Sequence, residues 1–350
     1  MDAERNNRNN GETMSIWQNY SKGERVVMLQ QTALREHLPQ AAIEKDWWVT
    51  VVLKALFMTD AAPAMLFKGG TSLSKGWHLI ERLSEDVDIA IDHSFFGVNG
   101  TNKSQRDKLR KKARAYIVEE LSVQLDEKMK ELDLRGYRIQ CVTTRDDGST
   151  IDSDKDPTCI LIWYEPVCEE QIGYIPPRVK VEITCLSMSE PSEVKEIRSL
   201  VSNYYQEEDN GTASSIKTVV PTRTFLEKAF LLNEEFQKDR PRHVRMSRHL
   251  YDLCQLMDTK YGCEALKDNA LYEEIVKHRE TYYSLKYVDY ERHSPELIDF
   301  VPPVSQREDW SRDYDNMLLS FIYGEAPSFT TLLKRMEELR ERFRKINKNN

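Results

Sequence analysis

Residues 64–91 constrain the fold of this chain more than any other segment, because they hold two apolar runs, a glycine pair and alternating carboxylates. The first run predicts a strand, Gly69 and Gly70 predict a tight turn, and the letters TSLSKGWHLI predict a helix. The later run, EDVDIAID, predicts a second strand. Successive side chains point to opposite faces of a strand, so Asp86 and Asp88 should share one face while the apolar residues pack against the other.

The glycine turn could hold an anion. Without a Cβ, Gly69 and Gly70 let the backbone approach a phosphate closely, and the N–H groups of the turn converge before a helix. A glycine pair before a helix is nevertheless more often an ordinary connection than a phosphate site. Lys68 or Lys75 could reach the tail of a triphosphate, or each could be a surface lysine. The candidate nucleotide-binding residues are Lys68, Gly69, Gly70, Thr71, Ser72 and Ser84.

The carboxylates of Asp86 and Asp88 would repel each other on one face of a strand. A divalent cation between them removes that repulsion, and Mg²⁺ prefers a few carboxylate oxygens together with the phosphates of a nucleotide. The alternative is an exposed acidic strand whose two side chains are solvated. Because the glycine turn precedes the pair by about 15 residues, we favour a metal site.

A third carboxylate, Glu182, lies in the predicted strand RVKVEITCL. Alternation places Lys180, Glu182 and Thr184 together on one face of that strand. A buried Glu without a partner would destabilise the strand, so Glu182 should meet either a metal ion or a cation, for which Lys180 is the alternative. Two-metal phosphoryl transfer needs ligands for a second ion. We therefore predict a metal site formed by Asp86, Asp88 and Glu182.

Two charged residues in the C-terminal part are further candidates. Lys228 lies in PTRTFLEKAFLLNEE, where a predicted helix begins its apolar stripe, and Asp252 lies in MSRHLYDLCQLMD beside a Leu-rich face. On their own, these two residues would form a charge pair between packed helices.

The composition excludes some classes of protein. A net charge of −8 argues against a protein that coats nucleic acid through its overall charge. Residues 238–249 and the tail from Lys334 are locally basic. Such runs are more often solvated helix faces than binding sites, although both would suit a phosphate-rich partner.

The chain is expected to be soluble and cytoplasmic. It has no apolar stretch as long as the roughly 18 residues of a membrane span, and its first residues lack the apolar segment of a secretory signal. The six cysteines show no C-x-x-C spacing, so we expect reduced, structural thiols.

Apolar periodicity predicts a mixed α and β part followed by helices. Predicted helices lie at 24–37, 40–58, 103–134, 224–237, 244–258, 263–282, 310–322 and 329–346. Predicted strands lie at 64–67, 87–91, 137–143, 159–164 and 178–186. The polar segment 206–215 is expected to separate the two parts. The predicted divisions are a polar, disordered N-terminus at 1–20, an α/β domain at 21–210 and a helical domain at 211–350.

Four stretches resemble one known family. FKGGTSLSKGWHLIERLSEDVDIAI resembles the first motif of the AbiEii/AbiGii toxin family, nucleotidyltransferase-like proteins of bacterial abortive-infection and toxin–antitoxin systems. IEKDWWVTVVLKAL resembles the helix before that motif, and RVKVEIT resembles the third-carboxylate strand. TFLEKAFLLNEE and RHLYDLCQLMD resemble the later Lys and Asp motifs. The order and approximate spacing match over about residues 40–260.

The resemblance implies a fold and a set of roles. It implies an α+β protein whose polymerase-β-like nucleotidyltransferase core, with a mixed sheet, precedes a C-terminal helical domain. Gly70, Thr71 and Ser72 would hold the triphosphate. Asp86 and Asp88 would hold Mg²⁺ or Mn²⁺, with Lys228 and Asp252 as essential residues beyond the core. In one departure, Arg248 is followed by His249, where the family motif often has Asp, so a contact of that Asp is missing or altered.

The implied activity is transfer of a nucleoside monophosphate (NMP) from a nucleoside triphosphate (NTP) to an acceptor hydroxyl. GTP or a pyrimidine NTP would be the donor, and RNA, with the tRNA 3′ end as one candidate, the acceptor. The protein would then act as a toxin in phage defence, with a cognate antitoxin that forms no stable complex with it. Two alternatives stay open: a catalytically silent nucleotide-binding module, and an antibiotic-type nucleotidyltransferase with a small-molecule acceptor.

Overall fold

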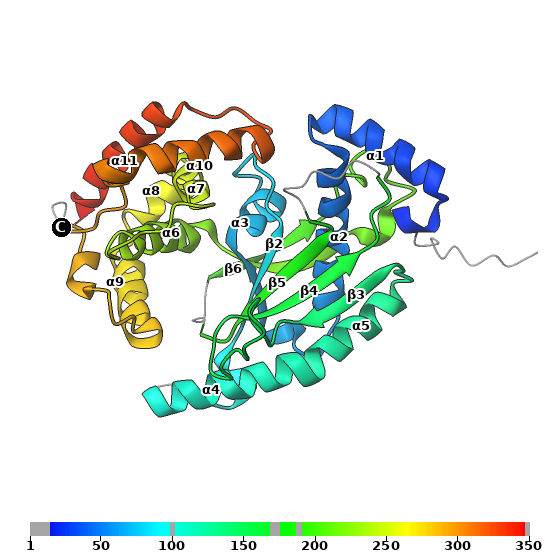
Figure 1. The fold of residues 1–350 in the computed structure, drawn as a ribbon, viewed down its shortest axis with the longest axis horizontal. Coiled ribbons are helices and arrows are strands. Elements are labelled where there is room, and N and C mark those ends of the chain that lie inside the picture. The colour runs from blue at the N-terminus through cyan, green and yellow to red at the C-terminus, as the bar shows by residue number, and fades with distance from the viewer. Residues whose placement is uncertain (1–14, 99–101, 169–175, 187–190, 347–350) are drawn as a thin grey trace, which may run out of the picture.

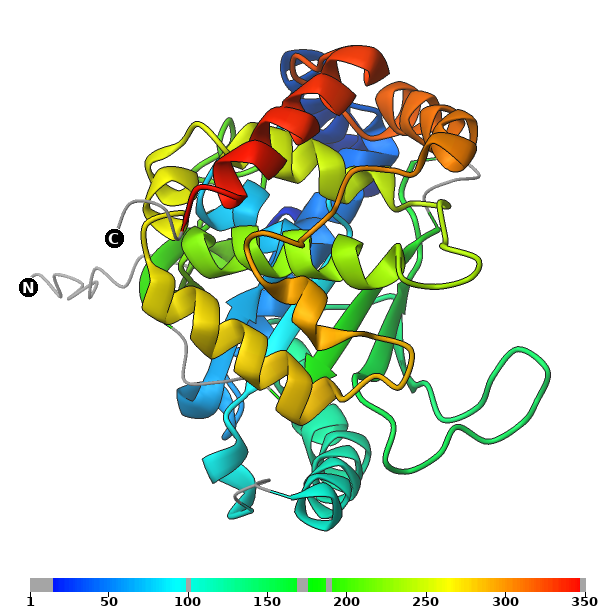
Figure 2. The ribbon, with the colours of Figure 1, turned by 90° about the vertical axis from the view of Figure 1, so that its left-hand side faces the viewer.

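In the described part of the chain, a seven-stranded mixed sheet forms one half of the molecule and a group of helices forms the other (Figures 1 and 2). The computed structural model describes residues 15–98, 102–168, 176–186 and 191–346. The strands are β1 Met65–Lys68, β2 Asp86–Ile91, β3 Tyr137–Cys141, β4 Thr158–Tyr164, β5 Arg178–Thr184, β6 Ser192–Ile197 and β7 Ser214–Val219. Their order in the sheet is β3-β4-β5-β2-β1-β7-β6.

The pairing of the strands places the predicted site at the middle of the sheet. β2 runs parallel to β5, and β1 runs parallel to β7. The other neighbouring strands are antiparallel. Since β1, β2 and β5 are adjacent, the glycine turn that follows β1 lies beside both carboxylate strands.

The helices divide between the two halves of the molecule. Around the sheet lie α1 Lys22–Glu36, α2 Gln40–Leu56, α3 Gly69–Thr71, α4 Lys103–Tyr116 and α5 Ser122–Glu131. The helical half contains α6 Pro221–Glu235, α7 Ser247–Leu256, α8 Lys260–Ala265, α9 Asn269–His278, α10 Arg307–Ser320 and α11 Phe329–Phe343. The 3₁₀ and π segments are η1 Trp17–Asn19, η2 Ala62–Ala64, η3 Ser72–Gly76, η4 His93–Phe96, η5 Ile117–Leu121, η6 Asn210–Thr212, η7 Arg279–Tyr283, η8 Tyr290–His293 and η9 Val304–Gln306.

The core forms where α2 packs against one face of the sheet. Trp47 and Trp48 of α2 are buried, as are Val87 on β2 and Val181 on β5. The apolar residues of β2 and β5 therefore face this core. Strand alternation turns the charged residues of β2 and β5 to the opposite face, toward the helical half.

The fold-class prediction is confirmed, because the sheet is mixed and a helical half follows it in the sequence. The predicted helix after the glycine turn is shorter than expected, since it consists only of α3 and η3. Residues 77–85 then lead to β2 without regular structure. The Leu83 N–H donates to the Phe321 carbonyl at 2.7 Å, and Arg82 forms an isolated bridge with Ile322. Pairing with the segment after α10 thus overrides the local helical pattern.

The sheet extends past the boundary predicted at residue 210. β6 and β7, which the sequence did not predict, form its edge, and the helices begin at Pro221. The expected separator 206–215 also contains a buried group, since Asp209 accepts a hydrogen bond from Trp47 Nε1 at 2.9 Å. That segment is therefore part of the packed structure. The division into domains stays a prediction.

The predicted polar N-terminus is only partly within the described residues, because residues 1–14 lie outside them. Trp17 does not fit the expectation of disorder for 1–20. It is fully buried, with its ring centroid 4.9 Å from that of Trp47, and its backbone N–H donates to Asp209 Oδ1 at 2.9 Å. One buried aromatic residue thus anchors a polar segment.

Two other expectations can be compared with the structure. All six cysteines lie in the described residues and are free, as predicted for reduced thiols. Within those same residues, no helix has the length and apolar character that crossing a bilayer requires.

Candidate active site

The glycine turn after β1 brings the backbone against a carboxylate. Gly69 has φ of +77°, and a Cβ built on it would lie 1.9 Å from Asp88 Oδ2. A Cβ on Gly70 would lie 2.7 Å from Arg82 Nη2 and 2.9 Å from Ser84 Oγ. Glycine is therefore required at the first position, for its positive φ and its close approach to Asp88, whereas a Cβ at the second would force Arg82 and Ser84 to shift.

The hydroxyl groups of the turn are used inside it. Thr71 and Ser72 are fully buried. The Thr71 hydroxyl donates to the Asp86 carbonyl. The oxygen of the same hydroxyl lies 2.9 Å from Ser84 Oγ. The Ser72 hydroxyl donates to the Gly69 carbonyl at 2.9 Å. Both residues hold the shape of the turn, and their predicted contact with phosphates stays a prediction.

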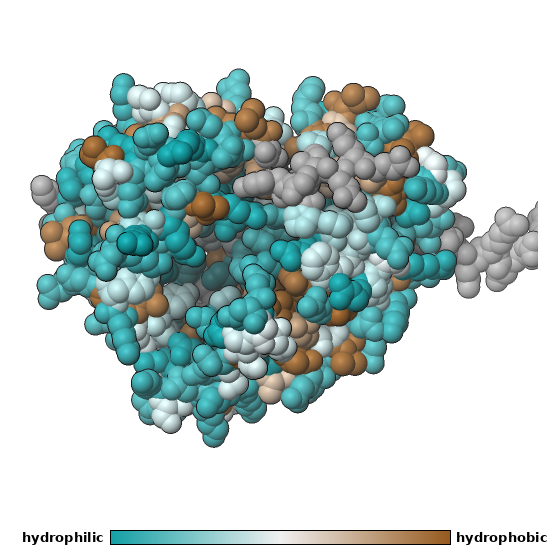
Figure 3. All heavy atoms as spheres, in the orientation of Figure 1, coloured by the Kyte–Doolittle hydropathy of each residue, from teal (hydrophilic) through white to brown (hydrophobic). Residues whose placement is uncertain are grey.

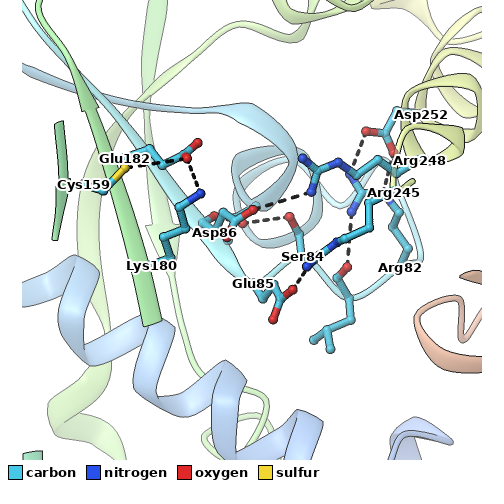
Figure 4. Close-up of polar contacts among 12 residues, drawn as sticks. Arg82, Ser84, Glu85, Asp86, Cys159, Lys180, Glu182, Arg245, Arg248 and Asp252 are labelled. Carbon is cyan, nitrogen blue, oxygen red and sulfur yellow. Dashed lines mark hydrogen bonds and ion pairs between the residues drawn. The ribbon is translucent and has the colours of Figure 1, made fainter. Parts of the chain in front are cut away.

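β2 and β5 place three carboxylates on one face of the sheet. Their parallel register pairs Asp86 with Lys180 and Asp88 with Glu182. Lys180 forms an ion pair with Glu182, and Arg248 Nη1 lies 3.5 Å from Asp86 Oδ2 (Figure 4). The partner of Glu182 in this structure is thus the lysine that the sequence named as the alternative to a metal.

Asp88 is destabilised in its charged form. Burial, followed by the charges of Glu182 and Asp86, raises the pKa of Asp88 to about 7, against the opposing effect of Lys68 and Arg248. A divalent cation beside this carboxyl would favour its charged form. The group therefore has the electrostatic character of a metal ligand.

The three carboxylates fit a hard divalent cation in their chemistry. Asp86, Asp88 and Glu182 offer only oxygen donors and share one face, and burial together with repulsion among them raises the pKa of Asp88. In the part of the chain that the structure describes, however, no three His, Cys, Asp or Glu side chains are placed to hold one ion together. Glu182 would have to turn away from Lys180. Its role as a third ligand stays a prediction.

A buried ion triad lies behind the glycine turn. Asp252 on α7 is fully buried, accepts hydrogen bonds from Arg82 at 2.7 and 2.8 Å, and lies 2.8 Å from Lys228 Nζ on α6. Although burial opposes ionisation, Arg82 and Lys228 hold the pKa of Asp252 below its ordinary value. Because Arg82 also lies against Gly70, the triad supports the turn from the helical half.

These groups surround a cleft of about 490 Å³ between the sheet and the helical half, a size typical of ligand sites. Figure 3 shows the surface hollowed in this region. The predicted site residues that line the cleft are Lys68, Gly69, Gly70, Ser84, Asp86, Asp88, Glu182 and Lys228. Thr71, Ser72 and Asp252 lie behind its wall.

Glu227 was not among the predicted site residues, yet it holds two cations at the cleft. Its Oε2 lies 3.6 Å from Lys68 Nζ, and its Oε1 accepts from Arg223 Nε at 3.1 Å. Although burial opposes this, the two cations lower the pKa of Glu227 to about 2. The carboxylate therefore stays charged and fixes Lys68 beside the glycine turn.

The sequence from 51 to 342 matches a family model described as nucleotidyl transferase AbiEii toxin, type IV toxin–antitoxin system. The match spans more than half of the chain. This chain belongs to the AbiEii family. It is therefore a nucleotidyltransferase toxin of a type IV toxin–antitoxin system, as the resemblance of its motifs implied.

Among solved structures, the AbiEii-family chain is similar to MenT4, the nucleotidyltransferase toxin Rv2826c from Mycobacterium tuberculosis H37Rv. The two chains are 15% identical, the alignment covers 93% of this chain and 98% of MenT4, and the TM-score is 0.44. None of the curated proteins matches this sequence.

Sequence patterns also missed the groups that hold β2 of this AbiEii protein in place. Glu85, next to Asp86, is buried and forms an ion pair with Lys45 of α2. It forms a second ion pair with Arg245 before α7 (Figure 4). Arg245 and Arg248 belong to the basic run at 238–249. That run was predicted to be a solvated face or a phosphate site, and these two arginines instead pair with carboxylates of the β2 region.

His249 stands where the AbiEii motif often has Asp. It lines the cleft, and its Nδ1 is buried with no hydrogen-bond partner among the residues that the structure describes. Burial, followed by the charges of Lys228 and Arg248, holds the pKa of His249 well below its ordinary value. A neutral imidazole thus lies beside Lys228 in place of a negative charge.

Gly69→Ala is expected to lower nucleotidyl transfer by about 100-fold, because the new Cβ would displace the Asp88 carboxylate. Gly148→Ala is the matched control, since Gly148 has φ of +81° and a Cβ added there would meet no atom of the described residues within 4 Å. Both variants should lose about 1–2 kcal/mol from the left-handed backbone in urea unfolding. Equal transfer by the two variants would contradict the role of the close approach.

Proposed function

We propose that this AbiEii toxin transfers an NMP from an NTP to a hydroxyl group of an RNA acceptor, with Mg²⁺ or Mn²⁺ held by Asp86, Asp88 and Glu182. One observation carries the proposal: the glycine turn closes directly over Asp88, whose pKa is raised to about 7 by burial and by the two neighbouring carboxylates. Such an arrangement of acids is stable in its charged form only beside a cation.

Different residues at the cleft would bind different parts of the NTP. The backbone of Gly69 and Gly70 would receive the triphosphate, with Lys68 and Ser84 beside it. Lys228 lines the cleft and would balance phosphate charge. Asp252 is fully buried, so it would act as a positioning residue that orients Lys228.

The reaction exchanges one bond at the α-phosphorus of the NTP. The acceptor oxygen forms a bond to the α-phosphorus, while the bond between the α-phosphorus and the oxygen that bridges it to the β-phosphorus breaks. Pyrophosphate leaves, and the hydroxyl proton passes to a carboxylate on the shared face of β2 and β5. When bound, a divalent cation supplies charge neutralisation on the phosphates and lowers the pKa of the attacking hydroxyl. The tRNA 3′ end is the first acceptor to test, and GTP and the pyrimidine NTPs are the first donors.

Incubation with each α-labelled NTP, Mg²⁺ and a total RNA pool tests the proposal. We expect one RNA size class to be labelled, EDTA to abolish the labelling, and Mg²⁺ or Mn²⁺ to restore it. Labelling of a small molecule in a cell extract, without labelling of RNA, would favour an antibiotic-type acceptor.

A cognate antitoxin that forms no stable complex should relieve growth inhibition without coeluting with the toxin.

Glu182→Gln tests the third carboxylate. It is expected to lower transfer by about 10-fold to 100-fold at a limiting Mn²⁺ concentration, because second-ion binding would weaken. Rising Mn²⁺ should recover part of the loss. Glu193→Gln on β6 is the control, since Glu193 is exposed and does not line the cleft. An unchanged Mn²⁺ dependence in Glu182→Gln would remove Glu182 from the ligand set.

A further inference from the structure

α4 concentrates positive charge in a chain that is negative overall. Seven of its 14 residues are Lys or Arg, and only one is acidic, whereas the whole chain has a net charge of −8. Four of its lysines are exposed and define what we name the α4 basic face: Lys103, Lys108, Lys111 and Lys112. Within the described residues, the cations of α4 make one ion pair, between Arg110 and Asp107 at 3.3 Å.

The other two basic segments are neutralised internally. On α11, Arg335 and Arg342 both pair with Asp258. In the run at 238–249, Arg242, Arg245 and Arg248 pair with Glu235, Glu85 and Asp86. The α4 basic face differs from both because Lys111 and Lys112 follow Lys108 by three and four residues, spacings at which like charges on a helix repel. An anionic partner would relieve that repulsion.

The position of α4 connects this charge to the cleft. Arg110 Nη2 donates to the Tyr282 carbonyl at 3.1 Å, and the next residue, Tyr283, lines the cleft. Figures 1 and 2 both show the first half of α4 beneath α9 of the helical half. A shallow surface hollow of about 600 Å³ is lined by Lys103, Ser104, Asp107, Lys108 and Lys111. A strand that leaves the cleft on this side would meet the basic face.

We propose that the α4 basic face binds the phosphate backbone of the RNA acceptor outside the cleft, while the end of that RNA occupies the cleft. This inference rests on the proposed function. Lysines on flexible stems contact phosphates without reading bases, so the surface would contribute affinity and register but no sequence preference. From Lys103 to Lys112 the helix rises about 14 Å, a length over which one nucleic-acid strand presents about four phosphates.

The test combines Lys103→Gln, Lys108→Gln, Lys111→Gln and Lys112→Gln in one variant of the full chain. The control variant carries the same charge change at four exposed lysines that do not line the cleft: Lys22, Lys267, Lys334 and Lys345. Binding of labelled tRNA is measured by fluorescence anisotropy at several salt concentrations. Transfer is measured with the same tRNA and with a short oligonucleotide of identical 3′ sequence.

The α4 variant should bind tRNA at least about 10-fold more weakly at low salt than the control. In a plot of the logarithm of the binding constant against the logarithm of the salt concentration, the magnitude of its slope should be smaller by about 3. Its KM for tRNA should rise by a similar factor, while kcat and the KM for the short oligonucleotide stay unchanged. Equal binding and equal salt slopes in the two variants would overturn the inference. If the α4 variant binds tRNA more weakly than the control but the wild type labels no RNA, the proposed reaction is overturned, while the inference that the α4 basic face binds RNA is supported.

Discussion

Asp88→Asn is expected to lower nucleotidyl transfer by about 1,000-fold, equivalent to about 4 kcal/mol of transition-state stabilisation, and to stabilise the metal-free fold. The amide cannot replace a charged carboxylate ligand. It also removes the repulsion from Glu182 and Asp86 and the penalty of burial, which together raise the pKa of Asp88. A variant that is more stable and inactive would identify this residue as one kept for function.

The stabilisation by Asp88→Asn should depend on pH. The folded protein keeps its proton on Asp88 up to a pH of about 7, whereas the unfolded chain releases it near the ordinary value of 3.8. Stability of the wild type therefore falls as pH rises through this window, and the variant should lack that component. Urea unfolding at pH 5 and pH 8, without divalent metal, should show a larger advantage for Asp88→Asn at pH 8. Asp309→Asn, at a partly exposed site where the carboxylate pairs with Arg312, is the control. A smaller advantage at pH 8 would contradict the assignment.

Asp252→Ala is expected to destabilise the protein by about 3–5 kcal/mol and to abolish transfer. The substitution would leave Arg82 and Lys228 as buried cations without their shared carboxylate. Because the pKa of Asp252 is lowered in the folded state, its contribution to stability is fully present above about pH 4 and is lost as pH falls further. Urea unfolding of wild type and variant should therefore converge in acid.

Asp209→Ala separates the two effects expected for Asp252→Ala. Asp209 is also fully buried and accepts hydrogen bonds from Trp17 and Trp47, and none of these three residues lines the cleft. This control should be destabilised as well, yet it should keep its transfer rate per folded molecule. Full transfer by folded Asp252→Ala would show that the ion triad does not position the site.

The carboxylate strands were predictable because strand alternation is a local property. Alternation alone predicted that Asp86 and Asp88 share one face of their strand and that Lys180 and Glu182 share one face of theirs. Neither prediction required knowledge of how the strands pair. The parallel register that joins Asp88 to Glu182 depends on residues about a hundred positions apart, and local periodicity does not encode it. The resemblance to the AbiEii family supplied the expectation that they meet.

Tertiary contacts decided the features that the sequence did not reveal. Arg82 lies in a segment with helical periodicity, but its partner Asp252 is 170 residues away. Thr71 looked like a phosphate donor because its hydroxyl follows the glycines, whereas the hydroxyl bonds to the backbone of Asp86. Both cases have the same cause: a polar side chain shows its chemistry in the sequence and its partner only in the fold.

The most direct measurement of the central claim compares α-labelled and γ-labelled NTP with one purified RNA acceptor in the presence of Mg²⁺. Nucleotidyl transfer at the Asp86 and Asp88 site predicts that the α-label enters the RNA, that the γ-label leaves as pyrophosphate, and that EDTA or Asp88→Asn stops both. Entry of the γ-label into the acceptor, or entry of the α-label at an equal rate in EDTA, would contradict it.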